Sequence, residues 1–229
     1  MKDNSLSKLG GTCAVLQAVS FIVVVIAFLP VPADQRQITG MYTNPGAFLE
    51  SFAKNSTLLT VVWGAEALGL LLGIAAVLAI SESVRSTNEG WVRWTSTLAI
   101  IGLALWALDD LRFLALTPGR AAAYVQGDAA IRAALTVPGA LDALDPRHWL
   151  RVGTVGVWAL VVSLLALRGG IWPKPLAYVG IGAGSANLLV LLADVFPNLS
   201  VLEVIGGIAA IISVPIWYIW LGLRLRKAA

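Results

Sequence analysis

Six long runs of apolar residues dominate this chain of 229 residues, and each is long enough to cross a lipid bilayer. A membrane-spanning helix needs about 20 mostly apolar residues. The runs predict spans at residues 9–29, 58–80, 94–116, 149–167, 176–196 and 201–223. The expected fold is therefore all-α. A single domain over residues 1–229 is expected to form one bundle of six transmembrane helices in a polytopic integral membrane protein.

The composition excludes several classes of protein. Hydrophobic residues make up 58% of the chain and charged residues 13%, whereas a soluble domain carries about 25% charged residues. A soluble globular enzyme, a disordered chain and a nucleic-acid binder are thereby excluded. One cysteine, Cys13, excludes a disulfide framework or a cysteine metal site, and one histidine, His148, excludes a multi-histidine centre. We therefore expect no metal, no cofactor and no nucleic-acid partner.

Basic residues are divided unevenly between the two ends of the predicted spans. Nine Lys and Arg residues lie on the side of the N-terminus, six lie on the opposite side, and Arg112 falls within a span. Cytoplasmic loops carry an excess of such residues, so both termini are expected to be cytoplasmic in a multi-pass plasma-membrane protein. The long connections after the first and third spans then face outward. Residues 120–135, rich in alanine, are expected to form a short helix near the membrane surface.

Tryptophan and proline residues mark the expected span boundaries. Every proline except Pro215 lies outside a predicted span or at its edge. Most tryptophans lie near span ends, where an aromatic belt at the membrane interface places them. These are Trp91, Trp94, Trp149, Trp172, Trp217 and Trp220.

Several ionisable residues lie within the predicted spans, where each costs at least ~2.5–3.5 kcal/mol at the bilayer centre. Glu66 lies about 12 Å below the outer edge of its span, given a rise of 1.5 Å per residue. With the predicted topology, all of them fall in the outer half of the bilayer. They are Glu66, Asp109, Asp110, Arg112, Arg151, Asp194 and Glu203. Such residues face protein or water, so they are candidates for a functional site.

Helical phase indicates which of these side chains share a face. Glu66 aligns with Gly69 and Gly73, and small residues favour close helix packing. Asp109 lies three residues before Arg112 and is expected to pair with it, whereas Asp110 points about 100° away. A stripe on the fifth span ends with Asn187 and Asp194. The predicted outward-facing polar pocket is formed by Glu66, Asp109, Arg112, Arg151, Asn187 and Asp194.

A structural role for the same residues stays open. Asp194 and Glu203 lie within a turn of a span end and are interfacial on that interpretation. On the same interpretation, Asp109 and Arg112 form a structural ion pair, and Arg112 or Arg151 is the structural partner of Glu66. No catalytic residue is predicted, because Ser185 has no histidine at the same end of a neighbouring span.

Two segments of the C-terminal half are similar to a known family. They are the turn Trp172-Pro-Lys-Pro-Leu-Ala-Tyr178-Val-Gly180 and the ending Pro215-Ile-Trp217-Tyr-Ile-Trp220-Leu-Gly222-Leu-Arg224. Leu9-Gly10-Gly11 adds a looser match. The chain resembles a bacterial family of six-helix membrane proteins known as domain of unknown function 4386. The resemblance implies six spans and a bacterial plasma membrane, and it carries no activity and no catalytic residues.

Three functions follow from these observations. The first is a non-enzymatic membrane protein whose pocket binds or passes a small polar ligand or a proton. The second is a structural or accessory subunit, in contact with lipid and with another membrane subunit, whose polar residues only lock helices together. The third, an intramembrane enzyme, has no supporting set of residues.

Overall fold

The computed structural model describes residues 5–32, 35, 44–137, 145 and 149–227, and every regular element in this part of the chain is helical. The long helices are α1 (Ser5–Phe28), α5 (Thr57–Val84), α6 (Glu89–Gln126), α9 (Thr154–Arg168), α10 (Lys174–Val195) and α11 (Ser200–Lys227). The short elements are α4 (Pro45–Lys54), α7 (Ala129–Leu135), the π-helical turn η1 (Trp149–Gly153) and the 3-10 turn η2 (Pro197–Leu199). The all-α prediction is therefore confirmed for the described residues.

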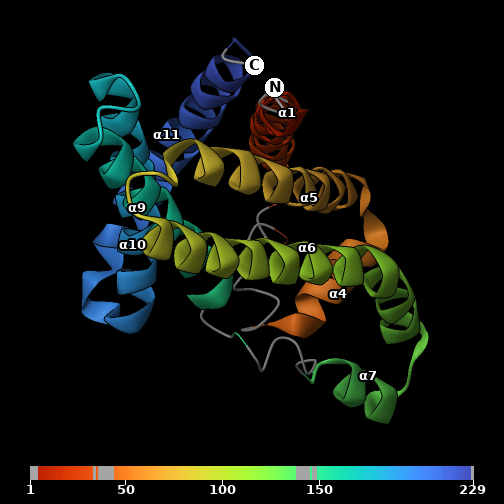
Figure 1. Ribbon diagram of the computed structural model, residues 1–229. Coiled ribbons are helices and arrows are strands. Elements are labelled where there is room, and N and C mark those ends of the chain that lie inside the picture. The colour runs from red at the N-terminus through yellow and green to blue at the C-terminus, as the bar shows by residue number, and fades with distance from the viewer. Residues whose placement is uncertain (1–4, 33–34, 36–43, 138–144, 146–148, 228–229) are drawn as a thin grey trace.

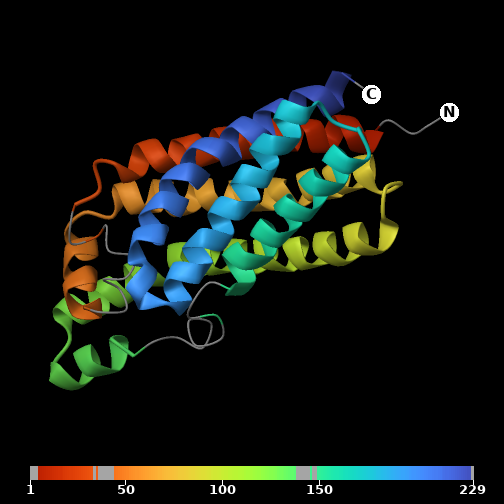
Figure 2. The same cartoon turned by 90° about the vertical axis from the view of Figure 1, so that its left-hand side faces the viewer.

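The long helices form a ring in chain order. Each packs against the next one along the chain, and α11 closes the ring on α1. Successive helices run in opposite directions, so the start of α1 and the end of α11 lie at the same end of the bundle (Figure 1). Figure 2 shows both chain ends on one side, with α4 and α7 at the opposite side. We call these two sides the terminal end and the distal end.

Five of the described helices are long and apolar enough to span a membrane. They are α1, α5, η1 with α9 (Trp149–Arg168), α10 over Lys174–Ala193, and α11 over Val204–Lys227. These correspond to five of the six predicted spans and indicate a multi-pass membrane protein. The remaining predicted span, residues 94–116, lies within α6, which is packed between α5 and α9 but is not among the five. Five of the six predicted spans are thus supported.

Helix α6 is longer than the sequence predicts. It begins after Asn88, whose side chain accepts a hydrogen bond from the backbone N–H of Trp91. It continues through Pro118 to Gln126, about 57 Å at 1.5 Å per residue, and bends in its C-terminal part (Figure 1). The expectation that a single Ala-rich helix covers residues 120–135 is wrong. Asp128 caps a separate helix, α7, so the segment is divided between two helices.

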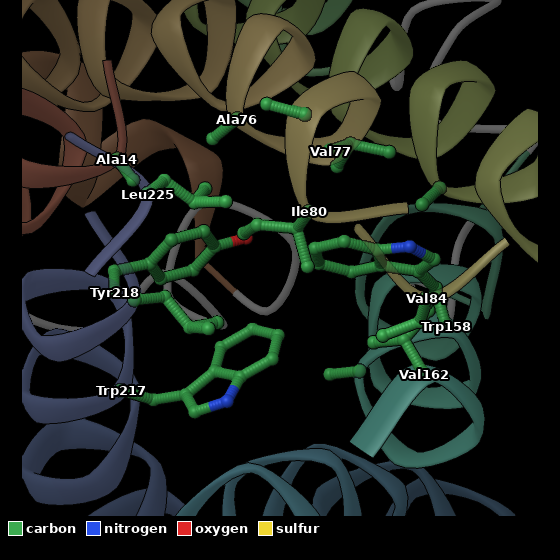
Figure 3. Close-up of a cluster of buried hydrophobic side chains, with 14 of the residues drawn as sticks. Ala14, Ala76, Val77, Ile80, Val84, Trp158, Val162, Trp217, Tyr218 and Leu225 are labelled. Atoms are coloured by element: carbon green, nitrogen blue, oxygen red, sulfur yellow. The ribbon is translucent and has the colours of Figure 1, made fainter. Parts of the chain in front are cut away.

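The main hydrophobic core occupies the terminal half of the ring. Trp158 on α9 meets Trp217 on α11 at 5.5 Å between ring centroids, and Tyr218 lies beside them (Figure 3). Trp172 packs on Trp217 at 6.3 Å. Trp172 and Trp217 are therefore buried, not interfacial as the sequence predicts. The four other tryptophans assigned to the interface remain exposed, namely Trp91, Trp94, Trp149 and Trp220.

Small residues bring the helices of the ring into close contact. A Cβ on Gly222 of α11 would lie 2.5 Å from the carbonyl oxygen of Gly11 on α1, so only glycine fits at this crossing. A Cβ on Gly69 of α5 would lie 3.0 Å from the Cβ of Ser20, also on α1. The predicted packing face that Gly69 shares with Glu66 is thus observed.

Large apolar side chains cover the outer surface of the bundle. On α11 and α1 several are more than half exposed, namely Ile26, Val201, Val204, Ile208 and Ile212. A soluble monomer rarely exposes such a continuous apolar surface. These faces are consistent with contact with the lipid bilayer.

Candidate functional site

A cavity of about 180 Å³ opens at the distal end of the ring, between α5, α6 and η1. We call it the acidic cavity. A single water needs only ~10–15 Å³ of such space, so the cavity has room for a small molecule. Its described lining is formed by Phe28, Gln35, Phe48, Leu59, Val62, Trp63, Glu66, Trp106, Asp109, Asp110, Phe113, Arg151 and Val152.

One wall of the acidic cavity is a buried ion-pair network centred on Asp109. Its Oδ1 accepts a hydrogen bond from Nη2 of Arg112 at 2.9 Å, which is the pair that the sequence predicts. Its Oδ2 accepts one from Nη1 of Arg151 on η1. Arg151 also donates from Nη2 to the carbonyl oxygen of Asp145 at 2.9 Å. Both sides of the Asp109 carboxylate are therefore occupied by guanidinium groups.

Asp145 also shapes the start of η1. Its carboxylate accepts hydrogen bonds from the backbone N–H groups of Leu150 at 3.2 Å and Arg151 at 3.1 Å. These two N–H groups belong to the first turn, where helix donors have no partner of their own. A π-helical turn is uncommon and frequently lies at a functional site. Here it directs the Arg151 side chain towards α6.

The opposite wall of the acidic cavity carries two carboxylates without a guanidinium bonded to them. Asp110 is only 4% exposed, and its Oδ2 has no hydrogen-bond partner in the described part of the protein. Glu66 on α5 interacts electrostatically with Asp110, but no hydrogen bond or salt bridge joins Glu66 to another described residue. A buried polar group without a partner costs about 1–3 kcal/mol, more when it is charged. Asp110 is therefore held at the cavity at a cost to stability.

The charges around the acidic cavity do not balance. The described residues supply four carboxylates, from Glu66, Asp109, Asp110 and Asp145, against two guanidinium groups, from Arg112 and Arg151. No three His, Cys, Asp or Glu residues in the described ranges are arranged to hold a metal ion. Among the described residues, acidic side chains thus outnumber basic ones around the cavity, and they do not have the geometry of a metal centre.

Two aromatic residues of the cavity lining, Trp63 and Phe113, belong to a ring stack that reaches α4. Phe52 on α4, Trp63 on α5 and Phe113 on α6 stack in series, with centroid separations of 5.7 and 5.0 Å. The guanidinium of Arg112 lies over the Phe113 ring at 4.9 Å. This stack fastens α4 across the distal end of the ring.

Gln35, which precedes α4 in the chain, holds α4 in place at the cavity. Its Nε2 donates hydrogen bonds to the Ser51 hydroxyl at 3.0 Å and to the Asn55 carbonyl oxygen at 2.9 Å. Gln35 is 2% exposed and lines the cavity. Gln35 therefore joins the cavity lining to α4 and to the residue that follows it.

A second cavity, of about 90 Å³, lies deeper in the ring. Glu66 and Trp106 line both cavities, so they form the boundary between them. Asn187 lines the second cavity, and its side chain donates to the carbonyl oxygen of Ala183 on its own helix at 3.0 Å. Gln17 and Tyr218 also line it, and each has a buried polar atom without a partner among the described residues.

The structure brings most of the predicted site residues together. Glu66, Asp109 and Arg151 line the acidic cavity, and Arg112 is bonded to Asp109. Asn187 lies in the second cavity, and the side chain of Asp194 at the end of α10 is outside the described part of the chain.

Sequence reasoning named Asp110 as a candidate but left it out of the predicted pocket, and it missed Gln35 and Asp145. Two adjacent carboxylates in one span are costly whichever face they take, and this cost was the signal that marked Asp110. Gln35 and Asp145 lie in connections, where hydropathy carries no signal.

Comparison with known proteins agrees with the resemblance seen in the sequence. The model of the family DUF4386, described as a domain of unknown function, matches residues 15–224. No curated protein and no solved structure matches the chain. The match covers all the helices that form the two cavities. This chain is therefore a member of the DUF4386 family.

Proposed function

We propose that this protein is a multi-pass membrane protein that binds a small polar ligand in the acidic cavity. The observation that carries the proposal is Asp110, which lines the cavity and whose Oδ2 is buried and has no hydrogen-bond partner among the described residues. A carboxylate that only stabilised the bundle would be bonded, as Asp109 is to two guanidinium groups. A hydrogen-bond acceptor that lacks a donor beside a cavity is typical of a group that receives a hydrogen bond from a ligand.

The proposal includes a topology with six crossings, in which α6 is the third. Helix α6 runs the length of the ring between two helices that qualify as spans, and its two buried carboxyl groups, Asp109 and Asp110, line the acidic cavity. Ionisable residues in a membrane helix face protein or a water-filled cavity, so they do not prevent α6 from crossing. The nine basic residues at the terminal end favour that end as cytoplasmic. The acidic cavity then opens outward from the plasma membrane.

We also propose that the protein is not an enzyme. The described cavity lining contains no hydroxyl, thiol, amine or imidazole side chain that would serve as a nucleophile. Its carboxylates would bind and orient a ligand but have no activated partner beside them.

A structural or accessory subunit is the second candidate. The paired Asp109, Arg112, Arg151 and Asp145 network favours it, because it joins α6 to η1. This candidate explains the network but leaves the unpartnered Asp110 without a role.

A ligand screen on the purified protein in nanodiscs tests the proposal. Binding is measured as a saturable rise in the unfolding temperature, since a ligand that binds the native state stabilises it. The screen covers amines, carboxylates, sugars and neutral alcohols. A ligand of the acidic cavity is expected to act on the wild type and on E50Q, an exposed carboxylate on α4, but not on D110N. A screen without a hit, or hits that D110N retains in full, would overturn the proposal.

A further inference from the structure

We infer that the ligand of the acidic cavity is a small organic cation, an ammonium group carried on an apolar body. This inference rests on the proposed function and adds the chemical class of the ligand. Three features of the described residues carry it: the charge balance, the aromatic lining and the second cavity.

The charge balance selects a cation. Arg112 and Arg151 are bonded to Asp109, and Arg151 is also bonded to Asp145. Glu66 and Asp110 both line the acidic cavity and interact electrostatically, and no guanidinium is bonded to either. A cation entering here would stabilise the carboxylate form of both groups, whereas an anion or a neutral molecule would not. An ammonium group supplies the positive charge, and a primary ammonium also carries the N–H donors that an unpartnered carboxylate oxygen requires.

The aromatic lining selects an organic cation over a hydrated metal ion. Trp63, Trp106 and Phe113 line the cavity together with the carboxylates. Tryptophan faces attract alkylammonium groups, and aromatic walls beside carboxylates are a recurrent way to bind them. Among the described rings, Trp106 is in no ring stack, whereas Trp63 is stacked on Phe52 and Phe113. Trp106 also lines both cavities, so part of its ring borders the space that a ligand would occupy. A hard metal ion would instead need several converging oxygen ligands, and the described residues do not form such a group.

The second cavity provides space for the apolar part of the ligand. It lies next to the acidic cavity, because Glu66 and Trp106 line both. Its described lining is apolar except for Gln17, Glu66, Asn187 and Tyr218. A cation held between Glu66 and Asp110 would therefore extend a short hydrocarbon part into a space of about 90 Å³. The cavity size excludes a long chain.

Matched pairs of probes test the charge requirement. Choline is compared with 3,3-dimethyl-1-butanol, its neutral isostere, and benzylamine is compared with benzyl alcohol. Sodium chloride and sodium acetate serve as the inorganic cation and anion. Binding is measured by calorimetry and by the unfolding temperature of the protein in nanodiscs. At least one organic cation is expected to bind at least tenfold more tightly than its neutral partner.

Variants of the lining residues test whether the cation binds in the acidic cavity. D110N and W106L are each expected to weaken binding of that cation at least tenfold, W106F to restore most of it, and E50Q to leave it unchanged. If W106L fails to fold, W106F and D110N still test the two walls. Equal binding of a cation and its isostere, a preference for acetate or Na⁺, or no binding of either organic cation overturns the inference. The proposed function survives those results if the wider screen finds a ligand that depends on Asp110, and falls if it finds none.

Discussion

Asp109 on α6 and Arg151 on η1 form a buried ion pair that joins positions 42 residues apart in the chain. Both side chains are about nine-tenths buried. Because Arg151 is also bonded to Asp145, the pair fastens the start of η1 to the middle of α6. The distal half of the ring is therefore held by buried ion pairs as well as by its aromatic stack, whereas the terminal half is held by the tryptophan core.

Removal of Arg151 is expected to destabilise the protein strongly. R151Q would leave Asp109 and Asp145 partly uncompensated in a buried site, and breaking a buried pair costs about 3–5 kcal/mol. R112Q should cost less, because Arg112 is more exposed and Asp109 would retain Arg151. Denaturant unfolding in mixed micelles measures both. The double variant D109N/R151Q should recover part of the loss, and additive losses in the double variant would contradict the pairing.

The glycine crossing between α1 and α11 provides a second test. G222A would place a Cβ 2.5 Å from the backbone oxygen of Gly11 and 2.8 Å from Cγ2 of Val15, so the helices must separate. Overpacking of this kind costs about 1–3 kcal/mol. G207A on the same helix is the control, because a Cβ there meets nothing within 4 Å. Thermal unfolding should show a loss for G222A only, and similar behaviour of the two variants would argue against this crossing.

A single hydrogen bond links α5 to the tryptophan core. Nε1 of Trp158 donates to the hydroxyl of Ser81 at 2.9 Å, and both residues are buried. S81A would leave the indole N–H without an acceptor, at a cost of about 1–3 kcal/mol. Ser83 bonds only to the Ile80 carbonyl oxygen of its own helix among the described residues, so S83A should have little effect. Equal unfolding temperatures for S81A and S83A would show that this bond contributes nothing.

The short connection between α5 and α6 carries a surface charge cluster with a predictable titration. The hydrogen bond from Arg85 lowers the pKa of Glu89 below its ordinary value, and the charges of Arg85 and Arg93 add to the effect. A lowered folded-state pKa stabilises the protein above the unfolded-state pKa, and this contribution is lost as the pH falls through the folded value. R85Q should therefore raise the pKa of Glu89, measured by NMR titration of the carboxyl carbon. An unchanged pKa in R85Q would contradict the hydrogen bond.

The sequence predicts the helices better than it predicts their ends. Hydropathy locates the spans, because a run of about 20 apolar residues has few other uses. It does not predict that α6 passes through Pro118, since the neighbouring helices stabilise a bend that propensity disfavours. The helix α4 was also missed. Its signals are an Asn44 cap and Pro45 in the first turn, and they are short and local.

The candidate site was predictable in part for a geometric reason. Helical phase correctly pairs Asp109 with Arg112, because that contact lies along one helix. It places Asp110 about 100° away and therefore outside a pocket on a single face. In the ring, α6 has neighbours on two sides, so Asp109 meets η1 while Asp110 meets Glu66 on α5. Contacts between helices of a ring cannot be read from the phase of one helix.

Comparison of D110N with D109N in the absence of any ligand tests most directly whether Asp110 serves a ligand or the fold. The measurement is the unfolding temperature of each purified variant in nanodiscs, relative to the wild type. If Asp110 is kept for a ligand, D110N removes a buried carboxyl group whose Oδ2 has no partner among the described residues, so its unfolding temperature should equal or exceed that of the wild type. D109N should unfold at a lower temperature, because it deprives Arg112 and Arg151 of their shared carboxylate. A loss in D110N as large as that in D109N would make Asp110 a structural residue and contradict the ligand site.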